Sequence, residues 1–308
     1  MTNNSVEQKP SETALFAALR RTIANKEFND NKFGPDYLAE YFLPPHFRFF
    51  LKFKPIRENT KNKLNEALPG LTEYMIARTA YFDVLFVDAL KGKTPQIVLL
   101  GAGYDTRAYR YAKLNQGTSI FELDILPTQE RKKECLRKSR IDNPDHVTFI
   151  PINFNQEALA DALEKAGYAK DQKTLFIWEG VSYYLEPDAV DATLEFVCHN
   201  AHPESSIAFD YTIPISADNI ADYYGVKEFT QTMVARHGNE ALLFSIEEGK
   251  AEAFLAQRGL KMVAHLDNEE IERTFLLKED GALLGRITGH FRFMSSSPKN
   301  VQENQQPN

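Results

Sequence analysis

The most informative stretch of the chain reads Gln96-Ile-Val-Leu-Leu-Gly101-Ala-Gly103-Tyr-Asp-Thr-Arg107. Four apolar residues run directly into Gly-Ala-Gly, and a continuous apolar run is typical of a parallel strand buried on both faces. Glycines let the backbone turn sharply and approach a ligand closely, because they carry no Cβ. The stretch therefore predicts a strand that ends at a cofactor-binding turn, with an ordinary tight turn as the alternative.

A second apolar run supports the cofactor interpretation, because it ends in two carboxylates. Residues 118–124 read Thr-Ser-Ile-Phe-Glu122-Leu-Asp124, and Glu122 lies 19 positions beyond Gly103. An acid about 20 positions beyond a glycine turn, at the end of the next strand, can accept hydrogen bonds from the hydroxyls of a ribose. The alternative is that Glu122 and Asp124 only solvate the end of a strand.

The residues after the turn favour a ligand without phosphate. Thr106 stands where a dinucleotide-binding turn usually has its third small residue. Asp105 is expected in the first turn of the following helix, where the helix dipole favours a carboxylate but the carboxylate repels a second anion. S-adenosyl-L-methionine carries an adenosine and a sulfonium and no phosphate, so the turn favours this cofactor over NAD.

Composition restricts the class of protein. The chain has 308 residues, 43% of them hydrophobic, which suffices for one large α/β domain with an added cap. Its net charge of −7 argues against a nucleic-acid or anionic-membrane partner. The two cysteines, Cys135 and Cys198, exclude a disulfide framework and a thiolate zinc site, and the scattered histidines suggest no metal site. The polar residues 1–10 and the absence of a long apolar run favour a cytoplasmic protein.

After Pro95, short apolar runs alternate with helical patterns, which predicts a parallel sheet built by right-handed crossovers. Strands are expected over residues 96–102, 118–124, 146–152, 174–179, 205–212, 261–266 and 286–294. Helices are expected over residues 13–24, 72–90, 104–113, 127–139, 155–166, 187–200 and 247–258. No strong helical pattern separates the last two strands, so one of them is expected to run antiparallel at an edge.

These elements suggest four parts of the chain. Residues 1–12 and 295–308 are polar and are expected to be disordered. Residues 13–94 are expected to form a helical N-terminal lid. Residues 95–294 are expected to form the cofactor-binding domain, with residues 213–246 as an irregular insertion over the strand ends.

The lid contains an aromatic and proline-rich segment, residues 42–51. Large apolar side chains at this density either pack inside a cap or form an exposed patch that binds a partner. Packing within the lid is the favoured interpretation, and a patch that lies on a membrane surface is the alternative.

Six stretches together resemble one known family. They are Leu68-Pro-Gly-Leu71, Ile76-Ala-Arg78-Thr-Ala-Tyr-Phe-Asp83, Leu99-Leu-Gly-Ala-Gly-Tyr-Asp-Thr-Arg-Ala-Tyr-Arg110, Phe121-Glu-Leu-Asp124, Phe176-Ile-Trp-Glu-Gly-Val-Ser-Tyr-Tyr-Leu185 and Phe254-Leu-Ala-Gln-Arg-Gly259. In this order, over residues 13–294, the chain resembles the leucine carboxyl methyltransferase-like, S-adenosyl-L-methionine-dependent O-methyltransferases. The resemblance implies a class I methyltransferase fold: a Rossmann-like seven-stranded sheet, mostly parallel with one antiparallel strand. It leaves the methyl acceptor open.

The resemblance also implies roles for single residues. Arg78 would hold the methionine carboxylate of the cofactor, which suits a guanidinium because it binds a carboxylate through two parallel hydrogen bonds. The alternative for Arg78 is an ion pair on the helix surface with Glu73 or Asp83. The turn Gly101–Gly103, including Ala102, would pass beneath the methionine and the ribose.

Further cofactor contacts are implied at the ends of the second, third and fourth strands. Asp124, together with Glu122, would bind the ribose. Asn153 stands where the family usually has an aspartate that accepts the adenine amino group, and its side-chain carbonyl can still accept that hydrogen bond. Phe154 could stack on the adenine. Glu179 would contact the amino group of the cofactor; the alternative, a helix cap, is better filled by residues 187–188.

The acceptor site is less defined. Candidate residues are Arg107, Tyr183, Tyr184, Tyr211 and His290. A carboxylate acceptor is ionised at neutral pH and requires no general base, whereas a hydroxyl acceptor requires one within hydrogen-bond reach. No His–Asp pair is obvious in the sequence, which favours a carboxylate of a small molecule or peptide. The alternatives are a nicotinamide-dependent oxidoreductase and a non-catalytic relative that binds S-adenosyl-L-methionine.

Overall fold

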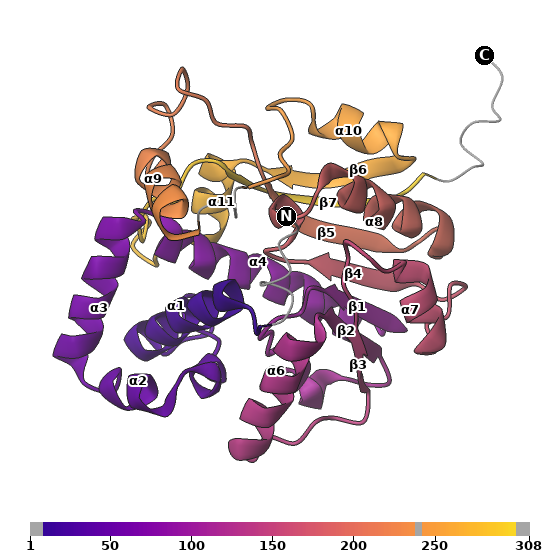
Figure 1. Ribbon diagram of the computed structural model, residues 1–308, viewed down its shortest axis with the longest axis horizontal. Coiled ribbons are helices and arrows are strands. Elements are labelled where there is room, and N and C mark those ends of the chain that lie inside the picture. Colours follow the sequence, from indigo (N-terminus) through magenta and orange to yellow (C-terminus); the bar gives the residue numbers. More distant parts are fainter. Residues whose placement is uncertain (1–8, 238–241, 300–308) are drawn as a thin grey trace.

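Seven strands form one sheet in the order β3-β2-β1-β4-β5-β7-β6. The computed structural model describes residues 9–237 and 242–299 (Figure 1). β7 runs antiparallel to both of its neighbours, and the other pairings are parallel. The strands are β1 (Gln96–Leu100), β2 (Ser119–Asp124), β3 (Val147–Pro151), β4 (Thr174–Trp178), β5 (Ser206–Thr212), β6 (Leu260–Leu266) and β7 (Phe291–Pro298). The predicted seven-stranded, mostly parallel sheet is confirmed.

Helices connect and cover the strands. They are α1 (Glu12–Phe28), α2 (Pro45–Phe50), α3 (Lys54–Ala67), α4 (Leu71–Lys91), α5 (Arg107–Arg110), α6 (Leu126–Lys138), α7 (Leu159–Lys165), α8 (Pro187–Asn200), α9 (Val226–His237), α10 (Ala251–Gln257) and α11 (Asn268–Phe275), with short 3₁₀ turns η1 (Ala39–Phe42), η2 (Ala112–Leu114) and η3 (Ser182–Tyr184). Four of these helices, α2, α3, α9 and α11, lie outside the ranges that were expected to be helical. The helix α3 is strongly polar, with Ile56 and Leu64 as its large apolar residues, and so few apolar positions give a weak signal for a helix.

The expectation of an antiparallel strand at an edge is wrong. The reversed strand β7 lies inside the sheet, between β5 and β6, and β6 forms the edge. A helix, α11, separates β6 from β7 in the chain and begins at a capping box in which Asp267 and Glu270 bond each other's backbone N–H groups. This start signal is local in the sequence and was missed. β7 also includes residues 295–298 of the tail that was expected to be disordered; residues 1–8 and 300–308 lie outside the described residues.

The sheet is buried on both faces. On one face, Val98, Leu100, Phe176 and Trp178 pack in a hydrophobic cluster that includes residues of α7, α8 and α10. On the other face, alternate strand residues such as Ile97 pack in a cluster with α1, α4 and α11. Figure 1 shows α7 and α8 on the side of the sheet away from the N-terminal helices. Side chains alternate between the two faces along a strand. Residues on the same face as Ile97, Ile120, Ile177 and Ala208 therefore point toward the N-terminal helices, which include α4.

The N-terminal helices share one hydrophobic core with the sheet, so residues 13–94 are not a separate hydrophobic unit. The long helix α4 packs directly against β4. Closer to the predicted cofactor turn, the ring of Phe42 in η1 stacks on Tyr104, with ring centroids 4.9 Å apart and planes 5° apart. Both rings are almost completely buried.

The aromatic segment 42–51 is divided between core and surface. Phe42, Leu43 and Leu51 are buried as expected, but Phe47, Phe49 and Phe50 are about half exposed. The expectation that the segment packs within the lid is therefore wrong for its central residues. Among the described residues, no helix combines the length and the apolar character that crossing a membrane requires.

Candidate functional site

The glycine turn after β1 adopts the conformation that its sequence predicts. Gly101 and Gly103 have φ angles of 67° and 48°, in the left-handed region that glycine occupies without strain. The N–H of Ala102 donates to the carbonyl of Leu123 at 2.7 Å, and the N–H of Gly103 donates to Asp124 Oδ2 at 2.6 Å. The turn is thus bonded to the end of β2, and backbone groups make the connection.

Two side chains lie directly on this turn. A Cβ at Gly101 would lie 2.4 Å from Val181 Cγ2, and a Cβ at Gly103 would lie 3.2 Å from the Cβ of Ala14. Helix α1 runs along the turn and is fixed there, because the Ser11 N–H donates to Thr128 Oγ1 at 3.1 Å and Arg21 donates to the carbonyl of Tyr104 at 2.8 Å. Any ligand on the turn therefore borders α1 and the segment around Val181.

The two acids at the end of β2 have different surroundings. Asp124 accepts hydrogen bonds from two backbone N–H groups, those of Gly103 and, at 2.7 Å, Ile125. Burial nevertheless raises the pKa of Asp124 to about 6. Glu122 lies deeper and its Oε2 pairs with Lys132 Nζ of α6 at 2.6 Å, with both side chains 1% exposed. Burial raises the pKa of Glu122 to about 7, so the alternative that it only solvates a strand end is wrong.

Arg78 of α4 lies at the ends of β4 and β5. Its Nε donates to Glu179 Oε1 at 3.0 Å, and its Nη1 lies 3.4 Å from Asp210 Oδ2. The side chain is 7% exposed. The alternative of a surface ion pair with Glu73 or Asp83 is wrong, because the guanidinium points to the strand ends and pairs with carboxylates there.

Asp210 is the main residue of this cluster that the sequence analysis missed. Its side chain is completely buried, accepts a hydrogen bond from the Gly180 N–H at 2.6 Å and bonds the hydroxyl of Tyr74. A signal was available, because Asp210 is the one acid in the apolar strand run Ile207-Ala-Phe-Asp-Tyr211. An acid on a buried strand needs partners, and its parity with Ala208 places it on the face of Arg78.

Arg107 holds three carboxylates at once. Its guanidinium lies 2.8 Å from Asp83, 2.5 Å from Asp105 and 2.7 Å from Glu179 Oε2, and it is 1% exposed. The charge of Asp105 is therefore balanced within the protein, which weakens the expected repulsion between Asp105 and an anionic ligand. These ion pairs also occupy the guanidinium of Arg107, which was predicted to bind the methyl acceptor.

The remaining acceptor candidates divide between the two faces of the sheet. Tyr183 is buried beside Arg78 and packs on Tyr184, with ring centroids 4.7 Å apart. His290 lies close by, since Phe291 packs against both His290 and Tyr183. Tyr211 belongs to the opposite face and its hydroxyl bonds His265 Nε2 at 2.8 Å. The structure thus brings Tyr183, Tyr184 and His290 together and separates Tyr211 from them.

Asn153 and Phe154 follow β3, next to the end of β2. The side-chain oxygen of Asn153 accepts a hydrogen bond from the Asn155 N–H at 3.1 Å, and its backbone N–H donates to Glu157 at 2.8 Å. Phe154 is half-buried against the cluster beneath the sheet. Both residues lie at the carboxyl ends of the parallel strands, as Asp124 and the glycine turn do. Their contacts with adenine stay predictions.

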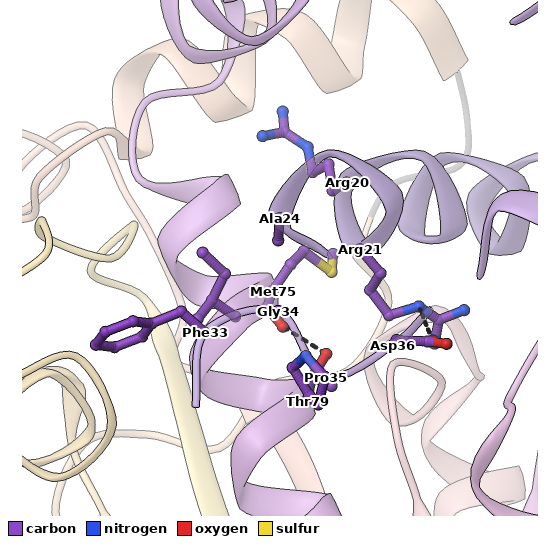
Figure 2. A pocket seen from close by; sticks show the side chains of 10 residues that line it. Arg20, Arg21, Ala24, Phe33, Gly34, Pro35, Asp36, Met75 and Thr79 are labelled. Atoms are coloured by element: carbon purple, nitrogen blue, oxygen red, sulfur yellow. Dashed lines mark hydrogen bonds and ion pairs between the residues drawn. The ribbon is translucent and has the colours of Figure 1, made fainter. Parts of the chain in front are cut away.

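Two cavities have linings that include none of the predicted cofactor-binding residues. One, shown in Figure 2, lies between α1, the segment after it and α4; Arg21 and Asp36 form an ion pair at 3.3 Å beside it. Its volume of about 10 Å³ is near that of one water molecule, so it does not hold an acceptor. The other, of about 270 Å³, lies outside β3 and is lined by residues that include Lys133, Arg137 and Phe149.

Comparison with known proteins identifies the family. The family model described as leucine carboxyl methyltransferase matches residues 14–198, more than half of the chain. The chain belongs to the leucine carboxyl methyltransferase family. The resemblance described from its motifs is thereby confirmed. The alternative of a nicotinamide-dependent oxidoreductase is set aside, because the family is one of methyltransferases.

Relatives with similar sequences carry names that agree with this assignment. YktD of Bacillus subtilis, named an S-adenosyl-L-methionine-dependent methyltransferase, is 27% identical over 77% of this chain and 79% of its own length. A similarly named protein of Mycolicibacterium smegmatis is 30% identical over 80% of this chain and 81% of its own length. These names agree with the cofactor expected from the sequence.

Solved structures support the fold. A Thermobifida fusca protein described as a methyltransferase superposes with a TM-score of 0.57 at 13% identity, over 95% of this chain and 96% of its own. A duf574 family protein from Streptomyces avermitilis gives the same TM-score at 12% identity, over 95% of this chain and 99% of its own. At such identities the likeness concerns the fold alone.

Proposed function

We propose that this methyltransferase binds S-adenosyl-L-methionine along the ends of β1, β2 and β4 and transfers its methyl group to a carboxylate oxygen of a small molecule or peptide. The observation that supports the cofactor position is the pair of bonds from the turn Gly101–Gly103 to the end of β2. These bonds bring the glycine turn and the carboxylate of Asp124 together at the sheet edge.

The side chains at this edge fit the cofactor chemically. Asp124 offers carboxylate oxygens to the ribose hydroxyls, and the Asn153 carbonyl offers an acceptor to the adenine amino group. Glu179 suits the ammonium group of the methionine, and Arg78 suits its carboxylate. Because Arg78 already pairs with Glu179 and Asp210, cofactor binding on this site exchanges part of one ion pair for another. Glu122 is paired with Lys132, which leaves Asp124 as the carboxylate proposed to bind the ribose.

The reaction is a displacement in which the acceptor oxygen forms a bond to the methyl carbon as the bond from that carbon to sulfur breaks. The cofactor supplies the methyl group and leaves as S-adenosyl-L-homocysteine. The protein's contribution is to hold the acceptor oxygen in line, since positioning alone can lower a barrier by about 7–11 kcal/mol. No proton needs to be removed when the acceptor is a carboxylate.

The groups near the ends of β4 and β5 favour such an acceptor. Burial, together with Asp210, raises the pKa of both Tyr74 and Tyr183 well above the usual value, so both remain protonated donors at neutral pH. Burial lowers the pKa of His290 to about 3, which makes its imidazole a weak base. Both tyrosine hydroxyls lie within hydrogen-bond distance of Asp210, which pairs with Arg78. With His290 a weak base and Asp210 engaged in these contacts, the cluster suits an acceptor that is already ionised better than a neutral hydroxyl.

The proposal is tested by transfer of a labelled methyl group to panels of carboxylic acids and phenols. We expect label in products that release methanol under mild alkali, as methyl esters do and aryl methyl ethers do not. Label in alkali-stable products would overturn the carboxylate assignment and leave methyl transfer standing. Tight binding of S-adenosyl-L-homocysteine without transfer to any acceptor would instead favour a non-catalytic relative.

A further inference from the structure

The segment around α2 exposes a cluster of large apolar side chains. Five of them form what we call the lid patch: Phe47, Phe49, Phe50, Phe53 and Ile56, with exposed fractions between 41% and 55%. The ring of Phe49 contacts two others, since its centroid lies 5.8 Å from that of Phe50 and 5.4 Å from that of Phe53. Clustered exposed aromatic side chains of this kind mark an interaction surface.

The patch is held in place by its inner side. Leu51 is 1% exposed and Leu43 is 6% exposed, so residues on either side of α2 are anchored in the core. Arg57 donates to the carbonyl of Leu51 at 3.1 Å, which fixes the junction between α2 and α3. The phenylalanines therefore project from a segment whose backbone is anchored.

The charge around the patch is opposite to that of the chain. Residues 46–63 contain six lysines and arginines and one acid, a local charge of +5 in a chain whose net charge is −7. Lys52 and Lys54 are exposed beside the phenylalanines. Acids facing this region from the described elements include Glu58, 3.7 Å from Lys54, and Glu27 of α1, 2.5 Å from Lys61. With Glu27 counted, the segment keeps a net charge of +4.

We propose that the lid patch docks on an anionic bilayer surface, with the phenylalanine rings in the interface and the lysines and arginines at the level of the headgroups. Aromatic side chains surrounded by cations on a short amphipathic segment are the combination that binds such surfaces. Docking of a second copy through the same patch would bring two cationic surfaces together. Figure 1 shows α2 at the periphery of the molecule, away from the sheet, so a flat surface can reach it.

Co-sedimentation of the full chain with vesicles tests this proposal. We expect binding to phosphatidylcholine vesicles that contain phosphatidylserine, weaker binding to phosphatidylcholine alone, and loss of binding as salt is raised. The double variant Phe49→Ser/Phe53→Ser should lower the partition coefficient about tenfold or more. The charge variant Lys52→Glu/Lys54→Glu should remove the preference for phosphatidylserine. Wild-type chain that stays in the supernatant overturns the proposal.

Matched variants at other surfaces control for general effects. Val263→Ser, at an exposed apolar residue of β6, and Lys165→Glu/Lys170→Glu, at exposed lysines around α7, should bind vesicles as the wild type does. Equal losses in these controls contradict the proposal. Sedimentation velocity without lipid gives a further outcome, since self-association that Phe49→Ser/Phe53→Ser abolishes assigns the patch to a second copy. The proposal is independent of the proposed reaction, and the affinity for S-adenosyl-L-homocysteine should be unchanged in every variant.

Discussion

The two halves of the candidate cofactor site are built in different ways. At the ends of β1 and β2, backbone N–H groups hold the carboxylate of Asp124 beside a glycine turn. At the ends of β4 and β5, two arginines from α4 and α5 hold Glu179 and Asp210. The first half depends on neighbouring stretches of chain and the second on side chains from four separate elements. We therefore expect substitutions at the ends of β4 and β5 to lower the free energy of unfolding more. Substitutions at the ends of β1 and β2 should act more selectively on the affinity for the cofactor.

The largest effect is expected from Arg78→Met. This variant leaves the buried carboxylates of Glu179 and Asp210 with one cation fewer, and breaking a buried pair costs about 3–5 kcal/mol. Chemical denaturation should show a loss of unfolding free energy of this size, and calorimetry should show loss of S-adenosyl-L-homocysteine binding. The control Arg273→Met removes an ion pair with Glu269 in which both side chains are at least 60% exposed, and it should change little. Equal effects in the two variants would contradict the distinction between the halves.

The next effect is expected from Gly101→Val, in the backbone-built half. A β-branched residue at a φ of 67° is strained, and its Cβ would lie 2.4 Å from Val181. Strain and overpacking together should cost about 2–4 kcal/mol of stability, and the bulk on the turn should abolish cofactor binding. Gly167→Ala supplies the control, because its φ is also positive but no atom lies within 4 Å of the added Cβ. Normal cofactor affinity in Gly101→Val would place the ligand elsewhere.

A smaller and more selective effect is expected from Asp124→Ala. Removal of the carboxylate leaves the ribose hydroxyls and the Gly103 N–H without an acceptor, so the affinity for S-adenosyl-L-homocysteine should fall by about 1–3 kcal/mol. Isothermal titration calorimetry measures this change. Unfolding free energy should change less than in Arg78→Met, since Asp124 pairs with backbone groups and its burial as an anion is unfavourable. A larger loss of stability than of affinity would reverse the comparison.

The pH dependence of binding follows from the raised pKa of Asp124, about 6. Below this pH the carboxyl becomes protonated and loses acceptor capacity, so the affinity for S-adenosyl-L-homocysteine should fall, by at most tenfold for each further pH unit. Above pH 7 the Asp124 carboxyl is ionised, so its titration should no longer change the affinity. Glu122 titrates nearby, with a pKa of about 7. Glu122→Gln should therefore keep the step near pH 6, and Asp124→Asn should remove it.

The smallest effect is expected from Asn153→Asp, which introduces the acid that the family resemblance implies after the third strand. A carboxylate is a stronger acceptor for the adenine amino group than an amide carbonyl, so affinity should rise about threefold to tenfold. The comparison with Asn155→Asp, two residues further along in the same exposed loop, separates adenine recognition from a general charge effect. Equal changes in both variants would remove Asn153 from the site.

The same division explains what the sequence alone could predict. Local sequence patterns predict the glycine turn, the end of β2 and the face of that strand on which Asp124 lies. Residues 96–124 therefore predict both the local fold and the position of this acid. Lys132 as the partner of Glu122, and Asp210 as a partner of Arg78, depend on which elements meet in space. For Arg78, the local alternative was a surface ion pair with Glu73 or Asp83. In the folded chain its guanidinium instead pairs with Glu179, a residue 101 positions away in the sequence.

The exposed phenylalanines were misjudged for a related reason. A dense apolar segment predicts burial because burial removes apolar area from water, and this holds for Phe42 and Leu51. The sequence pattern gave no means to separate these residues from Phe47, Phe49 and Phe50, because a helix of six residues is too short for a clear apolar periodicity.

The stack of Phe42 on Tyr104 joins the lid to the residue that follows the glycine turn. A displacement of η1 that separates these rings exposes both to water. Slow amide exchange should therefore be lost in η1 and around Tyr104 at one common opening rate, and a ligand that occupies the turn should slow exchange in both places together.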